Sequence, residues 1–247
     1  MKHLIKIMGL ILVVSSIYGF EKADKKQKED KATDGSVVYK GKQTKEGKEK
    51  VFVLYLNADQ TFIFQSIEEG DTNSTTLKGE FSWNKAGNQV TLVYAENRNK
   101  TTYRLQENVL EEIKEKKKSN AETEALTLQK IDLQEIRDKY WVAIEINKNK
   151  VNDGAYMFLN KENNKMKGSG GCNWFSGNYE IEEAQIKLSK IATTMKACLQ
   201  VDNETELFRA FQMIDNYTIS KDGQYLLFQK GKNVMVRFEV NYLKIVR

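Results

Sequence analysis

Residues 51–67 read VFVLYLNADQTFIFQSI, and this stretch decides the fold class of the chain. Two short runs of β-branched and aromatic residues, 51–56 and 61–67, flank the polar tetrapeptide NADQ at 57–60. Such runs are typical of β-strands, and a short polar break between two of them predicts a hairpin. We therefore expect an antiparallel β structure at this point of the chain.

The same pattern continues toward the C-terminus. The runs GEFSWN at 79–84 and QVTLVY at 89–94 flank a second turn, and 101–105 reads as a further strand. The segment ALTLQKI at 125–131 looks like the strand that closes this unit. Strands at intervals of about 8–12 residues predict an antiparallel meander or barrel.

A second β-rich unit begins at about residue 132. Turn-forming residues separate several of its apolar runs, and one helix on a curled antiparallel sheet is the expected architecture. The fold class is therefore mainly β (α+β), with two small antiparallel β domains at 37–131 and 132–247. The strand-like runs of the second unit are 140–146, 156–159, 179–181, 186–191, 217–220, 225–229 and 234–240.

The one clear helix signal starts at Asn203. This residue can cap a helix, and Glu206 three positions later would complete a capping box. The apolar residues that follow share one helical face, which is more often core than binding surface. They are Leu207, Phe208, Phe211 and Ile214.

Composition excludes several function classes. The chain has 247 residues, a net charge of +5, two cysteines and one histidine, His3. If the leader containing His3 is removed, no histidine remains for a catalytic triad, a metal site or a proton shuttle. The charge excess is mild and mixed with acidic residues, so we expect no nucleic-acid partner. The sequence predicts no cofactor and leaves the oligomeric state undetermined.

The N-terminus has the pattern of a secretory signal peptide. Lys2 and Lys6 precede the apolar run 7–14, which is shorter than a membrane span requires. We expect a signal peptide at 1–19 and a flexible, charge-balanced tether at 20–36. The alternative is a buried helix or an uncleaved anchor. No cysteine lies near the junction, so we expect an exported protein, periplasmic or secreted, without a lipid anchor.

Two polar segments could each be a binding site or an ordinary loop. The charge run EEIKEKKKSNAETE at 111–124 could be a basic patch, but acidic neighbours on both sides favour a solvated loop. The glycine-rich segment GSGGCNWFSGNY at 168–179 lacks the pattern of a phosphate-binding loop. It is better read as a tight loop that fixes Cys172 and Asn173 against the sheet.

The two cysteines, Cys172 and Cys198, both lie in the second unit. A catalytic cysteine would need a base, and two thiols alone make a poor metal site. In an exported chain an even pair most simply forms a disulfide. The alternative is a pair of small buried thiols, because sequence does not show whether the side chains meet.

A Gly-Cys-Asn segment at 171–173, followed by Gly177 and Tyr179, precedes a Thr-Met to Cys segment at 194–198 and the helix expected after Asn203. With these motifs, residues 132–242 resemble the META/HslJ-like domain. The family pattern is a Gly-Cys-Asn segment followed by Gly and Tyr, then a strand ending in a Thr-Met to Cys segment, then an acidic-capped helix. The resemblance implies no catalytic residues and an association with bacterial envelope proteins and stress responses. The matching residues here are Gly171, Cys172, Asn173, Gly177, Tyr179, Thr194, Met195 and Cys198.

The first unit resembles the N-terminal domain of NlpE-like envelope lipoproteins. The similar stretches are 39–41, LNADQTF at 56–62, GEFSW at 79–83 and YRLQENVLEEI at 103–113. That family usually carries an early CxxC pair and a lipobox cysteine. This chain has neither, since 42–50 reads KQTKEGKEK, so copper or redox chemistry is not carried over.

These observations predict a non-enzymatic, exported cell-envelope protein that binds a partner or supports envelope stress tolerance. The alternatives are a protease inhibitor or a small-ligand carrier that uses the interior of the first barrel. A carboxylate-based hydrolase is a third possibility, although the acidic residues lie in turns and charged loops without an evident pair.

Overall fold

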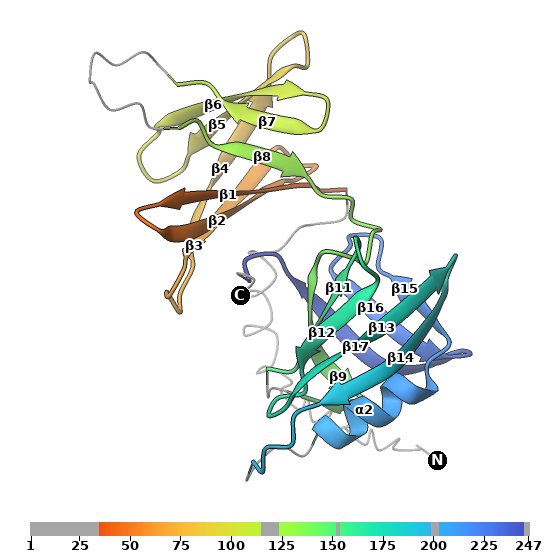
Figure 1. The fold of residues 1–247 in the computed structure, drawn as a ribbon. Coiled ribbons are helices and arrows are strands. Elements are labelled where there is room, and N and C mark those ends of the chain that lie inside the picture. Colours follow the sequence, from red (N-terminus) through yellow and green to blue (C-terminus); the bar gives the residue numbers. More distant parts are fainter. Residues whose placement is uncertain (1–34, 115–123, 152–153, 199–202, 245–247) are drawn as a thin grey trace, which may run out of the picture. The chain divides into compact units, whose positions relative to one another are not determined.

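The structure, a computed structural model, describes residues 35–114, 124–151, 154–198 and 203–244 (Figure 1). These described residues form two antiparallel β-sheets and one α-helix, which confirms the expected mainly β fold. The predicted signal peptide, the tether up to residue 34 and residues 115–123 of the charge run lie outside the described residues.

The first sheet has eight strands that pair in chain order. Because β1 also pairs with β8, through Tyr39 and Lys130, the sheet closes into a barrel. The hairpin expected around 57–60 is present between β2 and β3. The strands are β1 (Val37–Lys45), β2 (Lys48–Leu56), β3 (Thr61–Glu68), β4 (Thr75–Trp83), β5 (Gln89–Tyr94), β6 (Lys100–Gln106), β7 (Val109–Glu112) and β8 (Thr127–Lys130).

Side chains fill the interior of this barrel. Alternate residues of each strand point inward, so Val90 and Leu92 of β5 and Leu54 of β2 are fully buried. Tyr103 and Leu110 pack in the same cluster from β6 and β7. An eight-stranded barrel is just wide enough for its own side chains, and this one uses that space for a hydrophobic core.

The charge run at 111–124 was expected to be a loop throughout, but its first two residues belong to strand β7. Glu111 and Glu112 belong to β7, where Leu110 is buried and Glu111 points to solvent. The Glu112 carboxylate accepts a hydrogen bond from the backbone N–H of Leu126 (3.2 Å). Alternation along the strand therefore places Glu111 on the outer face and Glu112, which is half-buried, on the same face as Leu110.

The second sheet has nine strands in the order β10-β9-β11-β12-β13-β14-β15-β16-β17, and β9 also pairs with β17. The sheet curls until these two strands meet. Its strands are β9 (Tyr140–Ile146), β10 (Asn149–Lys150), β11 (Tyr156–Asn160), β12 (Lys165–Ser169), β13 (Trp174–Glu182), β14 (Gln185–Thr193), β15 (Asn216–Ile219), β16 (Tyr225–Lys230) and β17 (Asn233–Asn241).

One pairing in this sheet is incomplete. Strand β14 pairs with β13 along most of its length but with β15 only at Gln185, opposite Asn216. The backbone N–H of Ile186 then bonds the carbonyl of Asp215 (3.1 Å). From residue 187 to 193, no strand in the described part of the chain pairs with the second edge of β14.

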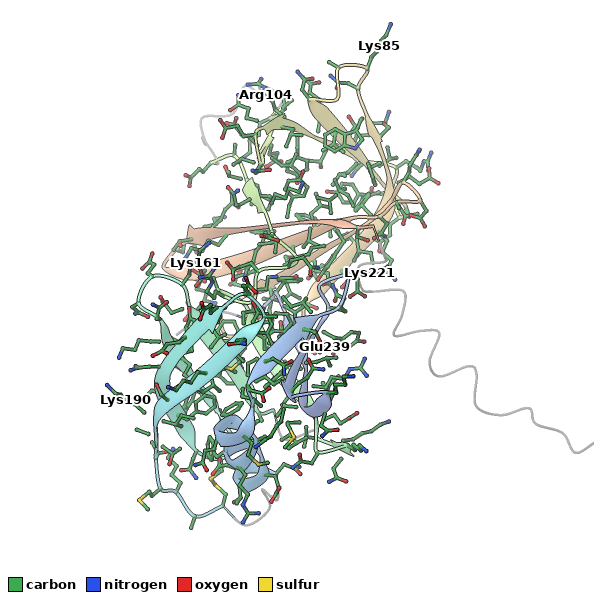
Figure 2. All side chains as sticks on the ribbon, turned by 90° about the vertical axis from the view of Figure 1, so that its right-hand side faces the viewer. Lys85, Arg104, Lys161, Lys190, Lys221 and Glu239 are labelled. Carbon is green, nitrogen blue, oxygen red and sulfur yellow. A yellow bond between two sulfur atoms is a disulfide. The ribbon has the colours of Figure 1, made fainter. Side chains whose placement is uncertain are left out.

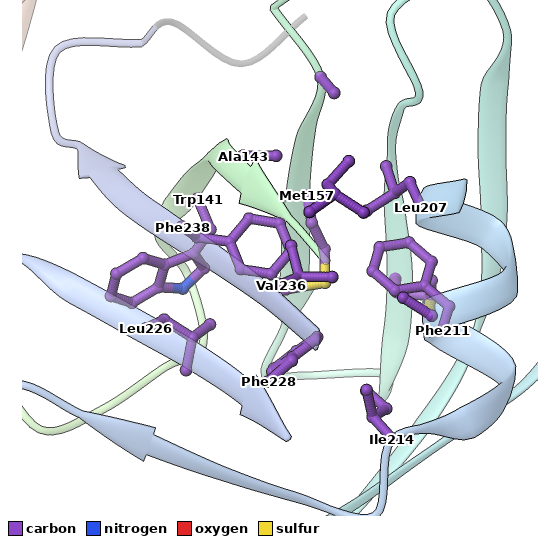
Figure 3. Close-up of a cluster of buried hydrophobic side chains, with 14 of the residues drawn as sticks. Trp141, Ala143, Met157, Leu207, Phe211, Ile214, Leu226, Phe228, Val236 and Phe238 are labelled. Carbon is purple, nitrogen blue, oxygen red and sulfur yellow. The ribbon is translucent and has the colours of Figure 1, made fainter. Parts of the chain in front are cut away.

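Helix α2 (Glu204–Met213) lies at the foot of the curled sheet, beside β14 and β9 (Figure 1). Its apolar face enters the core as expected, with Leu207, Ala210 and Phe211 buried. The rings of Phe211 and Phe228 lie 6.3 Å apart, and those of Phe228 and Phe238 lie 5.2 Å apart. Figure 3 shows this aromatic column, with Trp141 on the opposite side of the core from the helix.

The predicted capping box is wrong. Asn203 has helical backbone angles (φ −98°, ψ −13°) and makes no capping hydrogen bond through its side chain. A capping asparagine normally needs an extended backbone to reach the first free N–H groups. The Glu206 carboxylate is used elsewhere, accepting hydrogen bonds from Asn147 (3.2 Å) and Arg209.

The glycine-rich segment is also more regular than a loop. Gly168 belongs to β12 and residues from Trp174 onward belong to β13, which leaves only a four-residue turn at 170–173. Gly168 lies opposite Phe175, and a Cβ at Gly168 would come within 2.5 Å of the Phe175 ring. This glycine is therefore needed for the ring to enter the core.

Candidate functional site

The motif residues around Asn173 hold three segments together. These segments are the turn at 170–173, the stretch 194–198 that follows β14, and the first residue of α2. The backbone N–H of Thr194 donates to the carbonyl of Trp174 (3.0 Å), which continues the β13–β14 pairing past the end of β14. The three segments are far apart in sequence, so their contact depends on the folded sheet.

The side chain of Asn173 lies at the centre of this cluster and is 8% exposed. Its Oδ1 accepts hydrogen bonds from the Thr194 hydroxyl (2.8 Å) and the Lys196 backbone N–H (2.7 Å). Its Nδ2 donates to the Lys196 carbonyl (3.2 Å) and to Oε1 of Glu204 (2.7 Å). An amide group has two donors and two acceptor lone pairs, so Asn173 uses its full capacity.

Glu204 connects the turn to the helix. Its Oε2 accepts hydrogen bonds from the backbone N–H groups of Asn173 (2.6 Å) and Cys172 (3.2 Å). A Cβ at Gly170 would come within 2.6 Å of this carboxylate, so the glycine makes room for it. The first turn of a helix favours negative charge, and charge-assisted hydrogen bonds are stronger than neutral ones.

The cysteines form a disulfide, as the sequence predicted. Cys172 and Cys198 are bonded with their Cα atoms 6.2 Å apart, and 26 positions separate them in sequence. Cys172 belongs to the turn beside Asn173, and Cys198 ends the stretch that begins at Thr194. The alternative of two buried thiols is wrong because Cys198 is exposed and bridged.

Met195 differs from its motif neighbours. Its side chain is 97% exposed, whereas Thr194 and Lys196 on either side are both hydrogen-bonded to Asn173. The nearby Trp174 is 54% exposed, and its ring lies edge-on to Tyr156 at 6.1 Å. Among these motif residues, Met195 is the one whose side chain is almost wholly exposed to solvent.

The remaining motif residues shape the sheet. Gly171 has a positive φ of 109° in the turn, where other residues would be strained. Gly177 lies at a register irregularity between β13 and β14, and Tyr179 is 2% exposed. The Tyr179 hydroxyl donates to the carbonyl of Asn160 (2.8 Å). These residues have structural roles.

Glu204 was not predicted as a partner of Asn173, because the two residues lie 31 positions apart and no local sequence pattern connects them. Within the described residues, no group of three or more His, Cys, Asp or Glu side chains could hold a metal ion. No helix in the same part of the chain is long and apolar enough to cross a membrane. The geometry is that of a hydrogen-bonded turn beside which the side chain of Met195 is almost fully exposed.

Comparison with known families divides the chain at the same place as the two sheets. The model of the META domain matches residues 131–242, and that of the NlpE N-terminal domain matches residues 50–123. Both resemblances stated from the sequence are thereby confirmed, in the predicted order. No curated protein matches the chain.

Solved structures give more distant similarities. An NMR structure of a protein from Burkholderia xenovorans is 16% identical, with a TM-score of 0.38; the match covers 52% of this chain and 99% of that one. The crystal structure of the Cpx pathway activator NlpE from Escherichia coli is 14% identical, with a TM-score of 0.27. That match covers 58% of this chain and 82% of NlpE.

Proposed function

We propose that this chain, in which an NlpE-like N-terminal domain precedes a META domain, is an exported, non-enzymatic cell-envelope protein that supports envelope stress tolerance by binding a partner. The observation that carries the proposal is the pairing of these two domains in a chain with a disulfide. Each part of that observation points to the envelope by a separate argument.

The disulfide supports export. Disulfides persist in oxidising compartments such as the bacterial periplasm and are rare in the cytosol, where thiols are kept reduced. Cys198 is exposed, so a reducing cytosol would have access to the bridge. Export through the signal peptide expected at 1–19 places the chain where this bond is stable.

The domain pairing supports a role in stress tolerance. NlpE from Escherichia coli is described as an activator of the Cpx pathway, and the resemblance of residues 132–242 to META/HslJ-like domains implies an association with stress responses. Neither family is a known enzyme family. A binding role follows most simply, since the described motif residues bond to one another and present Met195 to solvent.

Of the two alternatives, the small-ligand carrier loses its expected site. Leu54, Leu92 and Tyr103 fill the first barrel with the rest of its core, so its interior is not a ligand cavity. The protease-inhibitor alternative is favoured by a specific observation, the exposed Met195 between two braced neighbours.

Complementation of a deletion strain tests the proposal. The full chain should restore growth under envelope stress, such as detergent, and should fractionate with the envelope or the medium. A matched variant lacking residues 1–19 should stay in the cytoplasm with Cys172 and Cys198 reduced, and should not complement. Equal complementation by the leaderless chain would contradict an envelope role.

A further inference from the structure

Met195 is the most exposed large apolar side chain among the described residues, at 97%. An apolar side chain in water gains nothing for folding, and a single one on a surface is ordinary. What is unusual here is its setting, because the chain on both sides of this exposed residue is fixed by the same buried asparagine.

The residue before Met195 is held from two directions. Thr194 donates its backbone N–H to the Trp174 carbonyl (3.0 Å), and its hydroxyl accepts from the Trp174 backbone N–H (3.1 Å). The same hydroxyl donates to Oδ1 of Asn173 (2.8 Å). These bonds fix both the main chain and the side chain of Thr194.

The residue after Met195 is held through its main chain. The N–H of Lys196 donates to Asn173 Oδ1 (2.7 Å), and its carbonyl accepts from Asn173 Nδ2 (3.2 Å). Two residues further on, Cys198 is bonded to Cys172. The backbone around Met195 is therefore fixed before any partner arrives, which lowers the entropy cost of binding.

We propose that residues 193–196 form an inhibitory loop that occupies the substrate cleft of a serine protease, with Met195 in a specificity pocket that accepts long apolar side chains. This goes beyond the proposed function, which names no partner. A protease cleft recognises one protruding side chain together with the extended main chain that leads to it. A braced loop whose most exposed apolar side chain is Met195 fits that form of recognition, and protease–inhibitor complexes are among the tightest known.

The approach to the loop also suits a protease. Extended peptides bind by adding a strand to an exposed sheet edge, and the edge of β14 from residue 187 to 193 has no partner strand among the described residues. Lys190 lies on this strand, and its side chain points away from the sheet (Figure 2). Lys190 has a positive φ of 52°, which interrupts the regular strand, so the part of this edge that leads directly to Met195 is residues 191–193. The enzyme can pair with the main chain of this short stretch.

The same bracing explains how the loop would resist digestion. Attack of the protease serine on the Met195 carbonyl forms an ester and breaks the bond to the Lys196 nitrogen, which takes a proton from the enzyme's histidine. Asn173 and the Cys172–Cys198 disulfide keep the new amine beside the ester. The amine can then return its proton and re-form the peptide bond, releasing the serine, so net cleavage is slow.

Inhibition kinetics with chymotrypsin and subtilisin test the proposal on the full chain. We expect at least one of them to be inhibited with a constant of about 1 µM or lower. Met195→Gly should weaken inhibition at least about 100-fold. Met195→Lys should transfer inhibition to trypsin, whose pocket carries an aspartate. Because Met195 is exposed, both variants should keep the wild-type melting temperature. Met213→Ala is the control at another exposed methionine, because Met213 ends helix α2 and alanine keeps the helix propensity there.

Asn173→Ala tests whether the bracing of the loop protects it from cleavage. Without the bracing side chain the loop should become a substrate, cut between residues 195 and 196 as read by mass spectrometry, while the wild-type chain stays intact. The proposal is overturned if the wild-type chain inhibits neither enzyme at about 100-fold higher concentration. It is also overturned if the wild-type loop is cut as fast as the variant.

The two proposals fail separately. If Met195→Gly loses inhibition but still complements the deletion strain, protease inhibition is real and the stress role depends on another surface. If the full chain complements but inhibits neither protease, the inhibitory loop is wrong and the envelope role stands.

Discussion

Replacement of Asn173 by alanine should be the most damaging single polar substitution in the META domain. It removes four hydrogen bonds at once, of which one is to the Glu204 carboxylate and two are to the main chain of Lys196. A neutral hydrogen bond contributes about 0.5–1.5 kcal/mol and one to a charged group about 1.5–3 kcal/mol. Thr194 and Lys196 are exposed, so water replaces part of this loss.

We therefore expect the free energy of unfolding to fall by about 2–4 kcal/mol. For a folding unit of about 110 residues this corresponds to a melting temperature lower by roughly 8–16 °C. Urea and thermal unfolding followed by circular dichroism measure both quantities. Asn233→Ala, at an exposed position that starts β17, is the matched control and should change stability by less than about 0.5 kcal/mol.

Introducing a negative charge at position 173 then tests whether the contact with Glu204 accounts for the lost stability. Asn173→Asp keeps the shape but places a second carboxylate against Glu204, so it should cost at least as much as alanine. Adding Glu204→Gln should recover part of the loss, because the glutamine amide can donate to Asp at position 173 and its oxygen can still accept from the turn. A loss below about 1 kcal/mol for Asn173→Ala, or no rescue by the second change, would refute this reasoning.

Three further predictions follow from other parts of the structure. Reduction of the Cys172–Cys198 bond, which spans 26 positions, should destabilise the second sheet by about 3–4 kcal/mol on the chain-entropy model and leave the cysteine-free first barrel unaffected; calorimetry with and without reductant distinguishes the two transitions. Burial raises the pKa of the Glu135 carboxylate, but hydrogen bonds and charge from Arg137 outweigh it and lower that pKa to about 2. Since a depressed carboxylate pKa stabilises the fold above the unfolded value, this contribution should be complete above about pH 4.5 and lost as the pH falls toward 2, and Glu135→Gln should flatten that part of the stability profile. Residues 132–247 expressed alone should unfold cooperatively, because the buried core cluster that contains Trp141, Phe211 and Phe238 is drawn entirely from this segment; a dye-binding product without a thermal transition would show that the domain boundary lies elsewhere.

Local sequence patterns predicted the strands that carry alternating or continuous apolar residues. Residues 140–146 match β9, and the stripe that includes Leu207 and Phe211 is the buried face of α2. Strand β12, KMKGS at Lys165–Ser169, was not predicted, because only Met166 is a large apolar residue in it. Its inward neighbour Gly168 has no side chain, and the space is taken by Phe175 from the next strand.

The candidate site was less accessible to sequence reasoning. The motif included Asn173, Thr194 and Met195. It could not show that the Asn173 side chain bonds to the residues on both sides of Met195. Glu204 was visible only as an acidic residue near a helix start, where local rules assign it to capping. Its true partners come from a turn some 31 positions away, and such a contact exists only once the sheet has curled.

The pairing of β13 with β14 has a consequence for the order of events when the chain folds. In an extended chain the two sulfur atoms are separated by 26 positions, but Trp174 and Thr194 bring the strands together just beside both cysteines. Once β13 and β14 have paired, only a few residues separate each cysteine from the paired strands, so the loop that the disulfide must close is short. The disulfide therefore forms after the hairpin. When a reduced chain refolds, we expect the β-strand content to rise before Cys172 and Cys198 are oxidised.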